Sequence, residues 1–171
     1  MLNITHSGDF SQGYIFIGPY QHPGAGPYIF DKFGNLVWDG FGITGSTNAH
    51  DFKVCQYRGK PHLCFSQMNQ RNGYGVGQGL IIDSSYRVVA SVQTGRDAMP
   101  ADMHKMNVID DEDNPTAILT SYRAIPYDLS AYNITTGIGW LSEGMFQEID
   151  IQSGEVLFEC KDTLASCANI C

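Results

Sequence analysis

Short alternations of apolar and polar residues, separated by glycine-rich turns, run along most of this chain of 171 residues. One arrangement occurs three times: a short strand ends on an Asp, a polar turn follows, and a second strand begins. We interpret Asp31, Asp83 and Asp150 as turn formers, because a carboxylate accepts backbone N–H groups in a tight turn. A hairpin repeated in this way, with other strands between its copies, predicts an all-β fold, an incomplete β-propeller of about three blades.

The same pattern divides the chain into segments. We expect an N-terminal extension over residues 1–12, the partial propeller over 13–159 and an irregular tail over 160–171. Residues 124–143 are interpreted as a long connection between strands, and no segment has helical periodicity beyond a turn or two. Three blades leave open edge strands at the two ends of the array, and such edges predict self-association.

The five cysteines fall into two groups. Cys55 and Cys64 flank residues 58–61, and if those residues form the loop of a hairpin the two cysteines face each other. Cross-strand neighbours of this kind can form a disulfide, and two buried thiols are the equal alternative. The other three cysteines lie in the tail: Cys160, Cys167 and Cys171.

Residues 73–79 (GYGVGQG) look at first like a dinucleotide-binding fingerprint. That motif follows a strand and opens a helix, whereas these glycines lead into the apolar strand 80–82. We therefore interpret them as a loop whose backbone passes close to a neighbouring blade or to a ligand. The acidic run 110–114 lacks the Gly and the distal Glu of a helix-loop-helix calcium site, so we interpret it as a solvated hairpin loop.

The net negative charge argues against binding to nucleic acids and to anionic membranes. A formal net charge of -8, with 16% charged residues, does not suit binding to nucleic acid or to anionic membranes. No apolar run approaches the roughly 20 residues of a membrane helix, and the first residues lack the features of a signal peptide. Neither a Cys-x-x-Cys pair nor a helical pair of histidines is present, and we expect no metal and no cofactor.

Two histidines occupy matching positions in successive repeats. The segment 49–54 (AHDFKV) aligns with 102–108 (DMHKMNV), which places His50 and His104 where the inner strand of a blade is expected to begin. Because inner strands line the central channel of a propeller, these histidines are the first candidates for a functional site.

Six segments, in the same order along the chain, carry a resemblance to a known family. They are 13–20 (GYIFIGPY), 26–31 (GPYIFD), 75–83 (GVGQGLIID), 101–104 (ADMH), 116–122 (TAILTSY) and 144–150 (GMFQEID). With them the chain resembles the N-terminal part of the propeller domain of fungal arylsulfotransferase-like proteins.

The resemblance implies a secreted β-propeller that moves a sulfuryl group from a phenolic sulfate ester to another phenol. It implies small phenolic molecules as partners, no soluble sulfate-donor nucleotide, and a histidine that is transiently sulfated and is expected in the later blades of the family's propeller rather than in this chain. An imidazole nitrogen is a competent nucleophile near neutral pH. Cationic donors match the charge on a transferring sulfuryl group.

The chain also departs from the family pattern. The family commonly has His where this chain has Gln78, and Glu where it has Lys105. The family continues through further blades, whereas this chain stops at Cys171, so we expect a truncated member that is inactive as this short chain. The alternative is a non-catalytic propeller fragment, either a binding or scaffold module or an inert truncation product.

The candidate site therefore has four members. His104 and His50 are the expected catalytic residues. The alternative for each is a structural histidine that only hydrogen-bonds a neighbouring loop. Arg123 is expected to contact a substrate anion, or alternatively to pair with an acidic neighbour on the surface. Gln78 can hydrogen-bond a substrate but cannot act as a nucleophile.

Overall fold

The computed structural model describes residues 2–5, 9, 11–70, 73–96, 98–135 and 137–162 of the chain. Three antiparallel sheets follow one another along the sequence, and each is a meander in which consecutive strands pair. Sheet A contains β1 (Tyr14–Ile17), β2 (Tyr28–Asp31) and β3 (Leu36–Asp39). Sheet B contains β4 (Asn48–Tyr57), β5 (Lys60–Gln70), β6 (Gly75–Ile82) and β7 (Val88–Val92). Sheet C contains β8 (Met106–Ile109), β9 (Thr116–Tyr127), β10 (Gly139–Asp150) and β11 (Val156–Asp162).

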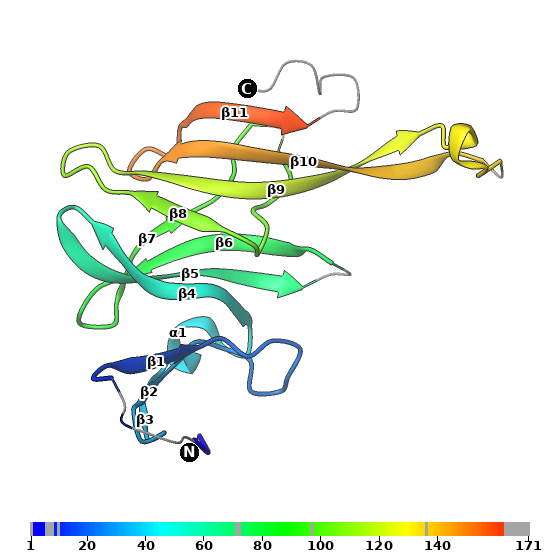
Figure 1. Cartoon of the computed structure of the whole chain (residues 1–171). Helices are drawn as coiled ribbons and strands as arrows, with labels where there is room; N and C mark the ends of the chain where they lie inside the picture. The colour runs from blue at the N-terminus through cyan, green and yellow to red at the C-terminus, as the bar shows by residue number, and fades with distance from the viewer. Residues whose placement is uncertain are drawn as a thin grey trace.

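The sheets are stacked in chain order, with sheet A at the bottom and sheet C at the top of Figure 1. Two short helical turns complete the regular structure of the described residues: α1 (Phe41–Thr44) and the 3-10 turn η1 (Ser130–Tyr132). The prediction of an all-β fold is confirmed, and three successive meanders are the arrangement expected of three blades in an incomplete propeller. Because the Asp hairpin joins the last two strands of each sheet, the described part of sheet A contains no counterpart of β4 and β8.

The three repeated aspartates form the hairpin turns, as predicted. Asp31 Oδ1 accepts the backbone N–H groups of Phe33 and Asn35, at 2.8 and 2.9 Å. Asp83 accepts two backbone N–H groups in the same way, and Asp150 accepts the backbone N–H of Ser153. Hydrogen bonds lower the pKa of all three carboxyls, which favours the charged form that accepts them.

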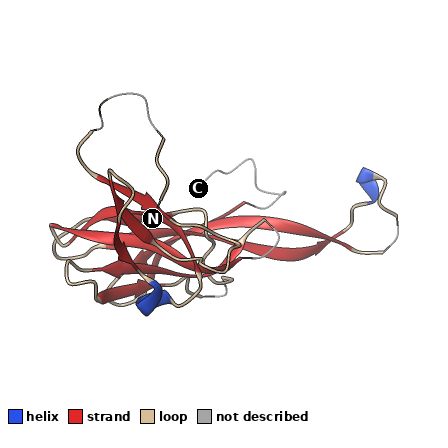
Figure 2. Cartoon of the chain, turned by 90° about the horizontal axis from the view of Figure 1, so that it is seen from below, coloured by secondary structure: helices blue, strands red, loops and turns tan. Residues whose placement is uncertain are grey.

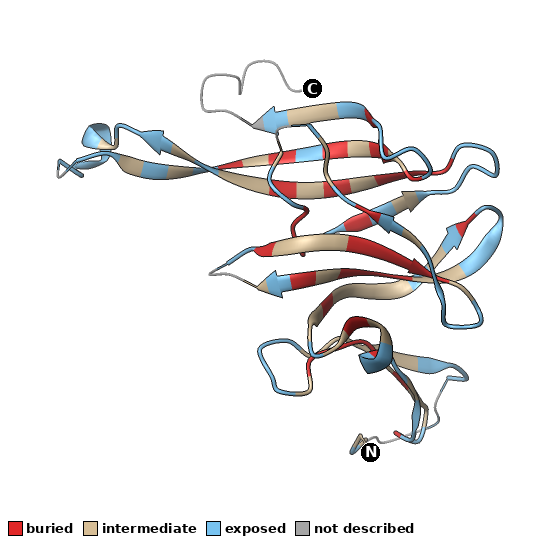
Figure 3. Cartoon of the chain, turned by 180° about the vertical axis from the view of Figure 1, so that it is seen from behind, coloured by how far each residue is buried: buried red, intermediate tan, exposed pale blue. Residues whose placement is uncertain are grey.

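The hydrophobic core lies on both faces of sheet B (Figure 3). A large cluster, the B–C core, joins sheet B to sheet C through residues such as Met68, Ile81, Met106 and Leu119. A smaller A–B core lies on the opposite face and contains Ala49, Phe65, Leu80 and Ile82. Neighbouring strand residues point to opposite faces, so Ile81 enters one core while Leu80 and Ile82 enter the other.

The glycine-rich segment is a strand rather than a loop, since β6 begins at Gly75. Its alternate glycines lie beneath methionines: a Cβ built on Gly75 would lie 2.9 Å from Met103 Cβ, and one on Gly77 would lie 2.7 Å from Met68 Sδ. A Cβ on Gly79 would overlap Met106. The predicted close approach to a neighbouring blade is therefore present, because Met103 and Met106 begin the path into sheet C.

The cysteine hairpin is shorter than predicted. A two-residue turn at Arg58 and Gly59, with φ of 52° and 67°, replaces the expected four-residue loop and pairs Tyr57 with Lys60. Cys55 therefore lies opposite His62 rather than opposite Cys64. Cys55 and Cys64 are diagonal neighbours with Cα atoms 5.8 Å apart, and they form a disulfide. Of the two alternatives that the sequence allowed, the structure thus has the disulfide rather than two buried thiols.

Two further expectations are corrected in sheet C. Residues 124–143 are not an irregular connection, since β9 and β10 continue to the pair Tyr127–Gly139. The resulting hairpin projects well beyond the sheets, with η1 near its tip (Figures 1 and 2). Strand β11 runs to Asp162, so the segment expected to be an irregular tail begins inside the sheet. Residues 163–171, with two of the tail cysteines, lie outside the described residues.

Candidate functional site

A buried carboxylate, Asp102, lies where the chain crosses from sheet B to sheet C. The crossing segment is fixed to β6 by an isolated bridge between Ala101 and Gly77. Asp102 Oδ1 then accepts the backbone N–H of Gly75 at 2.6 Å, and the Asp102 backbone N–H donates to the Thr120 carbonyl at 2.7 Å. The side chain of Asp102 is 1% exposed, so its acceptors are available only to these protein donors and to its neighbour His104.

His104 and Asp102 form a dyad. Asp102 Oδ2 accepts the backbone N–H of His104 at 3.0 Å and also contacts Nδ1 of the His104 ring. A carboxylate at Nδ1 holds the proton on that nitrogen, which leaves the lone pair on Nε2. The His104 side chain is 52% exposed, and its edge packs against Tyr122 with ring centroids 6.1 Å apart. The structure thus presents an oriented imidazole with its second nitrogen available.

His50 lies in a segment that contacts the segment of His104, since Asp51 accepts the backbone N–H of Met106. Burial lowers the pKa of His50, the interaction with His104 lowers it further, and Asp102 partly opposes both effects. The Nε2 atom of His50 is buried and has no hydrogen-bond partner among the described residues. Tyr20 lies against the imidazole with ring centroids 5.3 Å apart. His50 is therefore a neutral histidine with an unused nitrogen.

Asp51 ties the two histidine-bearing segments together. A bulge in β4 follows His50, and Asp51 adopts a left-handed backbone with φ of 53°. Asp51 Oδ2 accepts the backbone N–H of Met106 at 3.2 Å, and Lys53 Nζ bridges Asp51 to the Met106 carbonyl at 2.5 and 2.7 Å. Lys105 Nζ lies 3.6 Å from the same carboxylate. These contacts join the inner strands β4 and β8, and they add two cations to this end of the sheets.

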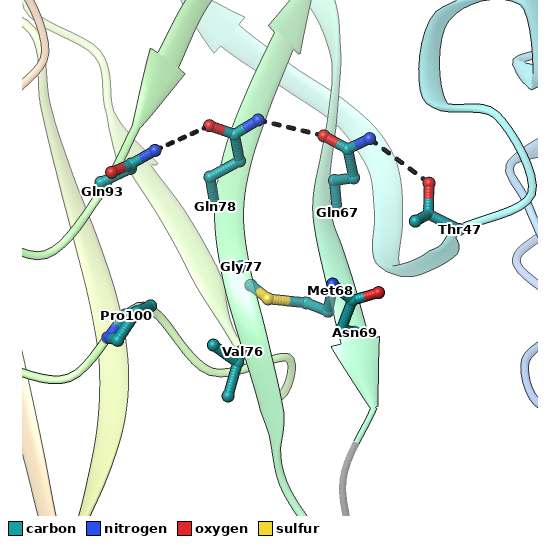
Figure 4. Close-up of a pocket in the computed structure, with 9 residues that line it drawn as sticks. All are labelled: Thr47, Gln67, Met68, Asn69, Val76, Gly77, Gln78, Gln93 and Pro100. Atoms are coloured by element: carbon teal, nitrogen blue, oxygen red, sulfur yellow. Dashed lines mark hydrogen bonds between the residues drawn. The ribbon is translucent and has the colours of Figure 1, made fainter.

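Gln78 belongs to a different feature, a row of side-chain amides across sheet B (Figure 4). Gln93 donates to Gln78 at 3.0 Å, Gln78 donates to Gln67 at 3.0 Å, and Gln67 donates to Thr47 at 3.3 Å. We call these four residues the amide ladder. It forms one side of a pocket of about 450 Å³ that is also lined by Met68, Asn69, Val76, Gly77 and Pro100.

Arg123 belongs neither to the amide ladder nor to the contacts around His50 and His104. Its Nε and a terminal nitrogen donate to Glu143 Oε2 at 3.0 and 2.6 Å, and the side chain of Glu143 is 1% exposed. The structure thus shows the acidic pairing that was the alternative to an anion contact. Arg123 also points away from the face of β9 that carries Tyr122, which contacts His104.

The sequence did not identify the partner roles of Asp102 and Asp51. The Asp-x-His spacing at 102–104 was visible, and it is the one signal that could have identified the dyad. Nothing local indicated that Asp102 would be buried, because its burial depends on the contact with Gly75 in another strand. Tyr20 and Ser66, which lies opposite His50, likewise reach the site only through pairing and packing.

No group of three or more His, Cys, Asp or Glu side chains in the described ranges is arranged to hold a metal ion. Nor does any helix among the described residues have the length and apolarity needed to span a membrane. What the arrangement offers is an oriented imidazole, a neutral second histidine and two neighbouring ammonium groups. The half-exposed imidazole of His104 can supply a nitrogen nucleophile to an ester.

Comparison with known proteins agrees with this chemistry. No curated protein and no solved structure matched the chain. A sequence model described as Arylsulfotransferase (ASST) matches residues 53–163, a stretch that contains Gln78, His104 and Arg123 and begins just after His50. Since this stretch covers well over half of the sequence, the chain belongs to the arylsulfotransferase (ASST) family.

Proposed function

We propose, contrary to the expectation of an inactive chain, that this chain carries out sulfuryl transfer from a phenolic sulfate ester to a phenol, with His104 as the nucleophile. The observation that carries the proposal is the Asp102–His104 dyad, in which a buried carboxylate contacts Nδ1 and leaves Nε2 on a half-exposed ring. Membership of the arylsulfotransferase family supports the reaction class.

The first step forms a bond between His104 Nε2 and the ester sulfur and breaks the bond from sulfur to the aryl oxygen. The donor leaves as a phenolate, and the Nδ1 proton stays in the hydrogen bond to Asp102. The sulfated ring then carries a positive charge, which the Asp102 carboxylate stabilises. Lys105, the residue after His104, has a 55% exposed side chain and offers a cation to the anionic donor.

In the second step the acceptor phenol attacks sulfur, the bond from nitrogen to sulfur breaks and the phenolic proton is lost. We assign the uptake of that proton to His50, whose lowered pKa keeps it neutral and whose Nε2 has no partner among the described residues. Tyr20 covers His50 and must move for the acceptor to reach this nitrogen.

The test is a transfer assay with 4-nitrophenyl sulfate as donor and phenol as acceptor, read as nitrophenolate release. We expect acceptor-dependent release, and a peptide containing His104 that gains the mass of one sulfuryl group when the donor is added alone. His104→Asn should abolish both signals, whereas His62→Asn, on the β4–β5 hairpin against Tyr57, should leave both unchanged.

Release without an adduct on His104 would show that another residue is the nucleophile. A folded protein with neither release nor adduct would contradict sulfuryl transfer by this chain. That result would favour the second candidate, a non-catalytic binding module of the same fold, which the pocket beside the amide ladder independently supports.

A further inference from the structure

The pocket beside the amide ladder contains no charged side chain. Its lining consists of one threonine, four amide side chains and residues without a polar side-chain group, and its volume is about 450 Å³. Pockets for small molecules lie in the range of about 300–1,000 Å³ and combine apolar surface with a few polar groups that orient the ligand. The lining therefore indicates a ligand without a formal charge.

The hydrogen bonds within the ladder leave a mixed set of donors and acceptors. Gln78 and Gln93 each use one amide N–H in the ladder, and each NH₂ group has two. The carbonyl oxygens of Gln67 and Gln78 each accept one ladder bond, and each has two lone pairs. The free N–H groups and lone pairs alternate along the row, which Figure 4 shows running across neighbouring strands.

The side chains of the ladder lie on one particular face of sheet B. Gln67 and Gln78 each stand two residues from a member of the A–B core, Phe65 and Leu80, and so point to the same face. His50 and Ser66 occupy the alternate positions and point to the face of the B–C core. The pocket thus uses a different face of the sheet from His50.

We propose that this pocket binds an uncharged, hydroxyl-rich ligand of the class of a sugar ring. Hydroxyl groups both donate and accept, which matches the alternating donors and acceptors of the ladder. The apolar surface of Val76 and Pro100 suits the C–H face of such a ring. A sulfate or carboxylate would meet no cation here, and a simple phenol has one hydroxyl group for several amides.

This inference does not depend on sulfuryl transfer, so its test measures binding alone. The side-chain NH₂ signals of Gln67, Gln78 and Gln93 would be followed by ¹H–¹⁵N NMR during titration with cellobiose. We expect saturable shifts of these signals with cellobiose and none with glucuronate, a sugar that carries a carboxylate. Shifts with phenol but not with cellobiose, or with none of the three probes, would overturn the proposal.

Substitutions in the amide ladder test whether the NMR shifts come from binding at this pocket. Gln78→Leu should weaken cellobiose binding about tenfold, because it removes the central amide of the ladder and leaves Gln67 and Gln93 without their ladder partner. Gln56→Leu, an exposed glutamine of β4 outside the pocket, should leave binding unchanged. If Gln78→Leu does not fold, Gln93→Ala at the exposed end of the ladder provides the same test, and unchanged affinity in a folded variant would contradict the assignment.

Discussion

The two faces of sheet B differ in how they use polar groups. On the side facing sheet C, alternate glycines of β6 admit methionines, the B–C core is extensive, and the charged residues Asp51 and Asp102 are held by backbone donors. On the side facing sheet A, the core is small and the polar groups are neutral amides joined to one another. Charged carboxylates therefore lie at the junction of sheets B and C, where backbone N–H groups donate to them, whereas the opposite face of sheet B carries neutral amides.

The largest expected loss of stability comes from adding a side chain at Gly77, where β6 lies in close contact with β5. In Gly77→Ala the new methyl group would overlap the Gln67 carbonyl oxygen and crowd Met68, so β5 and β6 must separate. We expect the free energy of unfolding in urea to fall by about 4 kcal/mol or more. Gly42→Ala is the control, since nothing lies within 4 Å of its Cβ position. A loss below about 1 kcal/mol would show that the strands are not in close contact there.

The second prediction compares the two cores directly. Ile81 and Ile82 are adjacent, both are 0% exposed, and they enter opposite cores. Ile81→Ala should cost about 3–4 kcal/mol and Ile82→Ala about 2–3 kcal/mol, because the larger core is less able to collapse around a cavity. Urea denaturation of both variants measures the difference, and the reverse order would contradict the ranking of the two cores.

The third prediction concerns the disulfide beside the B–C core. Replacing both cysteines, Cys55→Ser with Cys64→Ser, should lower the free energy of unfolding by about 2–3 kcal/mol, because the bond closes a short loop. Wild-type protein treated with reductant should lose a similar amount, which serves as a control for the serine side chains. Equal stability with and without reductant would mean that the disulfide does not restrict the unfolded chain.

The smallest effect is a pH dependence from His50. In the unfolded chain this residue protonates near its ordinary pKa of 6.5, whereas in the folded protein its pKa is lowered. The unfolded state therefore binds more protons between these values. Stability is complete above pH 6.5 and falls as the pH drops through this window towards the folded pKa.

The measurement is the urea midpoint between about pH 7.5 and pH 5.5, a range in which histidine is the main titrating side chain. His50→Gln should show a smaller loss of stability on acidification than the wild type. An identical pH profile in the two proteins would mean that folding does not lower the pKa of His50.

The features that could be predicted from sequence are those fixed by local geometry. Asp31, Asp83 and Asp150 form turns with residues two to five positions away, so the repeat, the hairpins and the all-β class could be deduced. The proximity of Cys55 and Cys64 could also be deduced, because the two cysteines belong to one short hairpin. Its register was wrong because Arg58, a residue without the freedom of glycine, adopts a left-handed conformation.

The features that could not be predicted depend on contacts between distant segments. The matching positions of His50 and His104 in the repeats suggested a shared place, but the contact that joins their segments, between Asp51 and the backbone N–H of Met106, could not be deduced from either repeat. The pairing of Arg123 with Glu143 was hidden because residues 124–143 lack a clear strand pattern, although two long strands pair there. The ladder formed by Gln67, Gln78 and Gln93 exists only through the register of three strands.

The methionines beneath the glycines of β6 have a chemical consequence. Met68 and Met106 are 1% and 0% exposed, so their thioethers are shielded while sheets B and C stay together. Oxidation would turn each thioether into a bulkier polar sulfoxide that the space above a glycine cannot accept. If sheets B and C separated once in the presence of peroxide, the oxidised methionines would prevent them from packing together again. Sulfoxide at Met68 and Met106 would therefore show that the two sheets had separated.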